Sequence, residues 1–100
     1  MPSDEGPPAD YLGGRLLEYA VLDKRASYSG HSHLFVGGKE LGPVPRLALS
    51  QLPEGEVLLA HCDDGWEVLG VAGYPSMGRA KRRAERIYPG VSACWVPVGG

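Results

Sequence analysis

Residues 56–90 limit the fold more than any other part of this chain. Two apolar runs, 56–62 and 66–74, are rich in Val and Leu, and Asp63-Asp64-Gly65 separates them. Asp-Gly between two such runs is a strong hairpin signal, because glycine adopts a positive φ at no steric cost. The sequence therefore predicts a β-hairpin here.

A helix over residues 76–88 is predicted directly after the hairpin. Ser76 is a favourable N-cap because its hydroxyl can accept a free backbone N–H, and Pro89-Gly90 stops the helix. Small or apolar side chains recur on one face, which we expect to pack on a sheet. The residues of this face are Met77, Ala80, Ala84, Ile87 and Tyr88.

The remaining segments give weaker signals. Residues 15–22 are predicted to be a strand that pairs with 31–36, and residues 91–98 a strand that Pro97 places at a sheet edge. Residues 46–52, which lie between two prolines, are expected to form two turns of helix. The expected aromatic anchors of the core are Trp66 and Trp95.

These elements predict an α+β fold in one domain, because a chain of 100 residues can build only one core. We expect a flexible tail over residues 1–10, which contain three prolines, followed by a single domain over 11–100. The predicted architecture is a small open antiparallel or mixed sheet with one C-terminal helix packed on it. The alternative is a ferredoxin-like split β-α-β with an extra N-terminal strand, in which 46–52 supplies the first helix.

Composition indicates a soluble bacterial protein of the cytoplasm. The first residues are acidic and rich in proline, unlike a secretory signal, and no apolar run approaches the roughly 20 residues of a membrane-spanning helix. Cys62 and Cys94 are too few for a disulfide framework, so both are expected to be reduced thiols. Arginine outnumbers lysine, which is typical of a GC-rich bacterial genome.

The sharpest charge asymmetry lies in the predicted helix. Five of the ten cations of the chain fall between residues 79 and 86, although the formal net charge is −2. Arginine suits phosphate and carboxylate groups because its planar fork donates two parallel hydrogen bonds. Solvated helices also display such charges, and Lys81 could pair with Glu85 one turn later. The candidate binding residues are Arg79, Arg82, Arg83 and Arg86.

A second candidate is a metal site built from His31, His33, His61 and Asp63. His31 and His33 would share one face of a strand, and imidazole and carboxylate groups are competent ligands. The spacing matches no strong zinc motif. Cys62 as a nucleophile is disfavoured, because the adjacent His61 would point to the opposite face of a strand.

No catalytic constellation emerges from the sequence, and no motif requires a cofactor. The leading hypothesis is a non-enzymatic module that binds another protein or a small ligand. Its surface would be the open sheet face or the arginine-rich helix, with the loop 37–45 at the margin. The alternatives are nucleic-acid or phosphate-ligand binding through helix 76–88, and metal binding. No membrane partner is expected, and an uncovered sheet edge would allow a homodimer.

Overall fold

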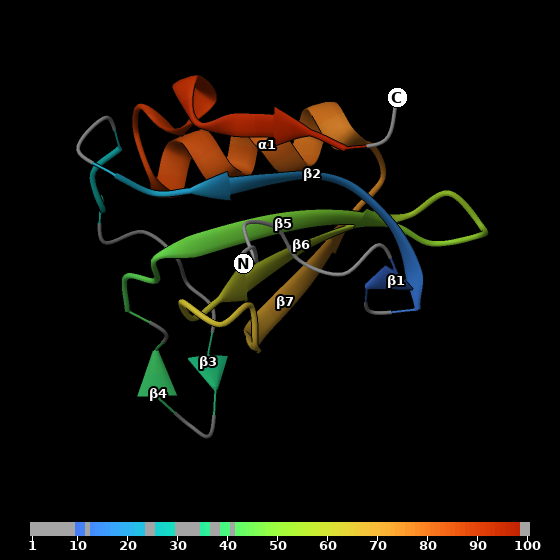
Figure 1. Ribbon diagram of the computed structural model, residues 1–100, viewed down its shortest axis with the longest axis horizontal. Helices are drawn as coiled ribbons and strands as arrows, with labels where there is room; N and C mark the ends of the chain where they lie inside the picture. The colour runs from blue at the N-terminus through green and yellow to red at the C-terminus, as the bar shows by residue number, and fades with distance from the viewer. Residues whose placement is uncertain are drawn as a thin grey trace, which may run out of the picture.

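Four antiparallel strands, each pairing with the next along the chain, form the centre of the fold (Figure 1). The computed structural model describes residues 10–11, 13–23, 26–29, 35–36, 39–40 and 42–98. The central strands are β2 (Gly14–Val21), β5 (Arg46–Gln51), β6 (Val57–Cys62) and β7 (Val68–Tyr74). Two short strands, β1 (Asp10–Tyr11) and β8 (Trp95–Pro97), both pair with β2. A separate small ladder joins β3 (Phe35–Val36) to β4 (Lys39–Glu40).

One helix carries the chain from one edge of the sheet to the other. After β7, the chain forms α1 (Met77–Ile87) and then a short 3₁₀ helix, η1 (Val91–Ala93), before β8 returns beside β2 (Figure 1). The resulting strand order is β8-β2-β5-β6-β7, and β1 pairs with the first residues of β2 on the same outer side as β8. The predicted α+β class, with an open antiparallel sheet and a C-terminal helix packed on it, is therefore confirmed.

The predicted helix at 46–52 is wrong, because residues 46–51 form the central strand β5. Residues 47–50 are all buried, since both faces of this strand are covered. A strand buried on both faces loses its alternating pattern, and a short apolar run then resembles a helix. The ferredoxin-like arrangement needed that helix, and the described residues do not show it.

Two N-terminal predictions are tested only in part, because some of their residues lie outside the described ones. Strand 15–22 is confirmed as β2, but its long partner is β5. Residues 31–34, part of its expected partner, lie outside the described residues. The same holds for residues 1–9 of the expected tail, whereas Asp10 belongs to β1.

Two apolar clusters lie on opposite faces of the sheet. The larger one joins α1 to the central strands and includes Leu47, Leu59 and Ile87, with Trp95 packed against it. The smaller one lies on the face away from α1, which we call the far face, and includes Trp66. Tyr19 meets the Trp66 ring edge-on with centroids 5.4 Å apart, and the Arg46 guanidinium lies 5.1 Å from the centroid of that ring. Trp66 and Trp95 thus anchor different clusters.

The β6–β7 hairpin is confirmed, but its turn has an unexpected backbone. Trp66, and not Gly65, adopts the positive φ, at 67°. Such a conformation is rare for a bulky residue. The carboxylate of Asp63 holds the turn by accepting the N–H groups of Gly65 and Glu67 at 2.8 and 2.9 Å. Burial of the Trp66 ring offsets the strain of its backbone.

The predicted limits of α1 are also confirmed. The Ser76 hydroxyl accepts the Arg79 N–H at 3.2 Å, which satisfies one free donor of the first turn. At the other end, the hydroxyl and N–H of Ser29 donate to the carbonyls of Arg86 and Ile87 at 2.9 and 2.8 Å. Ala80 and Ala84 are fully buried, so the helix lies close to the sheet.

We predict that Gly14→Ala destabilises the fold by about 1–3 kcal/mol, as overpacking of a tight contact does. A Cβ at Gly14 would lie 2.5 Å from the Gln51 carbonyl oxygen and 2.6 Å from the Ser50 hydroxyl oxygen. Gly42→Ala is the matched control, because a Cβ there meets no atom within 4 Å. Urea unfolding measures both free energies, and equal values for the two variants would contradict the assigned contact between β2 and β5.

Candidate binding surface on helix α1

Two charged residues on one side of α1 are engaged within the molecule. The Lys81 ammonium pairs with the Glu18 carboxylate at 2.7 Å and lies 5.6 Å from the Trp95 ring centroid. The Glu85 carboxylate accepts the N–H groups of Gly90 and Ser92 at 2.8 and 3.1 Å. The suggested pairing of Lys81 with Glu85 is therefore replaced by contacts that hold β2, β8 and η1 to the helix.

The arginines lie on the other side of α1. Arg79, Arg82, Arg83 and Arg86 follow the spacing i, i+3, i+4, i+7, which places them on one stripe of a helix. We call these four residues the arginine stripe. The side chains of Arg79, Arg82 and Arg86 are exposed, and none of the three forms an ion pair with a described residue. All four predicted binding residues are thus brought together.

The position of the stripe follows from the apolar face of the helix. Successive residues are rotated by about 100° around the helix axis. Because Ala80 and Ala84 lie against the sheet, Lys81 and the arginines lie on opposite flanks of the helix. Lys81 faces β2 and β8. The arginine stripe therefore lies on the flank toward β6 and β7. Arg83, which is half-buried, is close enough to β6 to act on the charge of His61.

His61 is a buried histidine beneath the helix. Its side chain is 2% exposed, and Nδ1 has no hydrogen-bond partner among the described residues. Burial, as the larger effect, and the positive charge of Arg83 lower the pKa of His61 from 6.5 to about 4. The imidazole is therefore neutral at pH 7 and belongs to the packed interior.

The metal hypothesis receives no support from the described residues. His31 and His33 lie outside them, and the described part of the chain contains no cluster of three or more His, Cys, Asp or Glu side chains suited to a metal. Asp63 uses its Oδ1 atom to hold the hairpin turn. A site that includes His31 and His33 stays a prediction.

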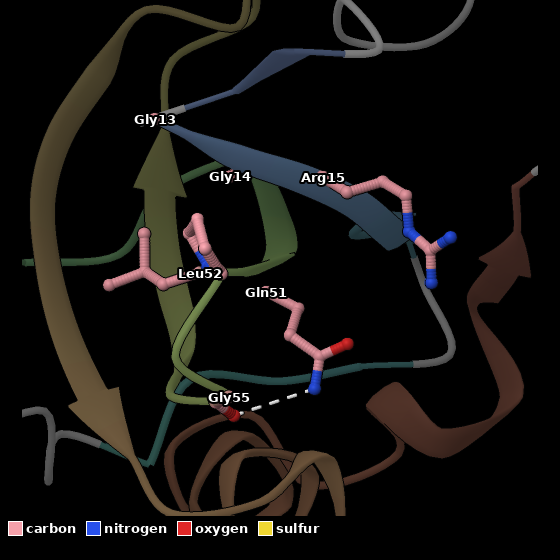
Figure 2. A pocket seen from close by; sticks show the side chains of 7 residues that line it. Gly13, Gly14, Arg15, Gln51, Leu52 and Gly55 are labelled. Carbon is pink, nitrogen blue, oxygen red and sulfur yellow. Dashed lines mark hydrogen bonds between the residues drawn. The ribbon is translucent and has the colours of Figure 1, made fainter.

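A shallow pocket of about 720 Å³ lies at one end of the sheet (Figure 2). Its lining residues come from the start of β2, the end of β5 and the turns next to them. Arg15 is its one charged side chain among the described residues, and this arginine is exposed. The Gln51 amide is turned to the Gly55 carbonyl at 3.4 Å, apart from the Arg15 guanidinium (Figure 2). The pocket is lined by Gly13, Gly14, Arg15, Gln51, Leu52, Pro53 and Gly55.

Sequence reasoning missed the partner of Lys81. Glu18 lies 63 positions away, and no local spacing joins the two residues. The loop 37–45 lies partly outside the described residues, but its end is fixed to the helix: the Val44 N–H donates to the Tyr88 hydroxyl at 2.9 Å. Cys62 and Cys94 are both buried free thiols, in keeping with the expected absence of a disulfide.

No protein-family description, curated protein or solved structure matches this chain. No helix within the described residues has the length and apolar character needed to cross a membrane.

We predict that acid destabilises the fold through His61. The unfolded chain binds a proton at this residue below pH 6.5, whereas the folded chain resists protonation down to about pH 4. The contribution of His61 to stability is therefore fully present above pH 6.5. The free energy of unfolding falls by about 3 kcal/mol through this residue as the pH drops to 4. Urea unfolding at several pH values measures the effect. His61→Leu should flatten this pH dependence, and an unchanged slope in the variant would refute the assignment.

Proposed function

We propose that this protein is a non-enzymatic binding module that holds an acidic protein segment against the arginine stripe of α1. One observation carries the proposal: the helix engages Lys81 and Glu85 internally and leaves three arginines exposed on one flank without a described ion-pair partner. Carboxylates supplied by a partner would neutralise these exposed arginines.

Arginine side chains on one stripe suit carboxylates in particular. Each guanidinium can donate two parallel hydrogen bonds to one carboxylate, which gives direction as well as charge. The stripe spans eight residues, from Arg79 to Arg86, which is about 10 Å of helix. This length fits a short run of Asp or Glu side chains, and Arg86 also lies in the last turn, where the helix dipole favours a cation.

Nucleic-acid or phosphate binding is the second candidate function, supported by the same arginines. An acidic protein segment is favoured because the chain as a whole carries a formal charge of −2 and a pI near 5.9. Domains that bind nucleic acid through the phosphate backbone usually have a pI above about 9 and a wider basic surface. The proposal places the protein in the bacterial cytoplasm, where both partner classes occur.

We predict that a peptide of about ten glutamates binds the protein at an ionic strength of about 0.05 M, where surface charges are weakly screened. Changing Arg79, Arg82 and Arg86 together to Gln should weaken this binding at least about tenfold, because it removes three contacts to carboxylates. Glutamine is a good helix former, so α1 should persist. Fluorescence anisotropy of a labelled peptide measures the affinity, and circular dichroism checks the fold.

The matched control is a pair of single variants, Arg82→Gln and Arg15→Gln. Both residues are exposed and both changes remove one positive charge, but Arg15 lies on β2 away from the stripe. Only Arg82→Gln should weaken binding. Equal weakening by both variants, or no binding of the peptide by the wild type, would overturn the proposal. A DNA duplex of about 20 base pairs that binds more tightly than the peptide would establish the second candidate instead.

A further inference from the structure

Arg46 is a half-buried cation on the far face of the sheet. It begins β5, and the residue opposite it on β6 is Cys62, a member of the apolar cluster that includes Trp66. The Arg46 guanidinium lies 5.1 Å from the centroid of the Trp66 ring. Both α1 and η1 contribute to the larger cluster on the other face. Arg46 therefore lies apart from the arginine stripe.

The charge of Arg46 has no counter-charge in the described part of the chain. Arg46 forms no ion pair with a described residue, and its Nε atom is buried there without a hydrogen-bond partner. The Trp66 ring attracts the cation, but it has no oxygen atom to accept the N–H groups of the guanidinium. A cation that has lost part of its water attracts an anion more strongly than a fully hydrated cation does. Arg46 therefore offers a position for an anionic group.

Exposed apolar side chains lie beside Arg46 on the same face. Val21 is opposite Arg46 on the neighbouring strand β2 and is 40% exposed. Half-buried Tyr19 lies two residues earlier on the same face, opposite Val96 of β8, which is 41% exposed. Diagonal neighbours across an antiparallel pair are about 7–8 Å apart, so the two valines belong to one patch. We call Val21, Tyr19 and Val96 the apolar platform.

We propose that Arg46 and the apolar platform bind a small organic acid that joins one carboxylate to an apolar body. The carboxylate accepts two parallel hydrogen bonds from the guanidinium. The apolar body lies on the platform, where it removes exposed apolar surface from water. This site is independent of the arginine stripe, which lies on the helix side of the sheet.

A single negative charge suits this site better than a phosphate or an acidic peptide does. Val21, Cys62 and Trp66, which oppose or contact Arg46, are all uncharged. A carboxylate matches the one positive charge of Arg46, whereas a phosphate monoester of charge about −1.5 to −2 would keep excess charge beside an apolar surface. A run of Asp or Glu side chains would likewise set further charges on the platform. The acidic segment proposed for the arginine stripe is therefore not expected here.

Octanoate, octanol and acetate separate the two parts of the proposed site. Octanoate carries both the carboxylate and an apolar chain, octanol lacks the charge, and acetate lacks the chain. We expect octanoate to bind the full chain with a dissociation constant on the order of millimolar, and the other two to bind at least about tenfold more weakly. Titrations followed by heteronuclear NMR locate the site, and the signals of Val21, Arg46 and the Trp66 indole should shift.

Arg46→Gln tests the cation, and Arg15→Gln is the matched control. Both changes remove one positive charge, but Arg15 is exposed at the start of β2, away from the platform. Arg46→Gln should weaken octanoate binding at least about tenfold, whereas Arg15→Gln should leave it unchanged. Val21→Thr replaces one exposed methyl group with a hydroxyl and should weaken it about threefold. Circular dichroism verifies that the variants fold.

Three outcomes would overturn the proposed site. The first is equal binding of octanoate and octanol by the wild type, because the cation would then contribute nothing. The second is the absence of shifts on the far face at about 20 mM octanoate, or shifts confined to α1. The third is equal weakening by Arg46→Gln and Arg15→Gln. If Arg46→Gln does not fold, the comparison of octanoate with octanol in the wild type decides.

Discussion

The burial of one sheet face beneath a single short helix is the constraint on which the rest of the structure depends. An α-helix with its side chains is about 10 Å wide, and neighbouring strands are about 4.8 Å apart, so one helix covers little more than two strands. Ala80 and Ala84 bring α1 close to the larger cluster, in which β5 and β6 contribute Leu47 and Leu59. The central strands are therefore buried, whereas the helix leaves the edge strands partly uncovered.

The same contact separates the charges of the helix. Once the alanines face the sheet, the flank that carries Lys81 turns to β2 and β8, where Glu18 and Trp95 receive it. The opposite flank carries the arginine stripe toward β6 and β7. Burial of His61 on β6 keeps its imidazole neutral, so the interior next to Arg83 adds no second positive charge at pH 7.

Local signals in the sequence determined the C-terminal half. The Asp-Gly turn, the Ser76 cap and the Pro89-Gly90 stop predicted the hairpin and α1, and helical spacing placed the arginine stripe, because each feature depends on residues only a few positions apart. Even here the backbone of the turn was decided by packing. Trp66 takes the strained conformation that was expected of glycine, since burial of its ring against Tyr19 offsets the strain.

Tertiary structure alone decided the features that join distant segments. Residues 46–51 form a strand that the sequence did not predict. Both faces of this strand are covered, so it lacks the alternating pattern that would have identified it. Glu18 became the partner of Lys81 because β2 and β8 lie beneath that flank of the helix. The absence of a described strand on the outer side of β7 follows from strand order, which depends on pairing between residues far apart in the chain. A sequence pattern records which side chains can be buried, but only the assembled sheet determines which of its edges remains free.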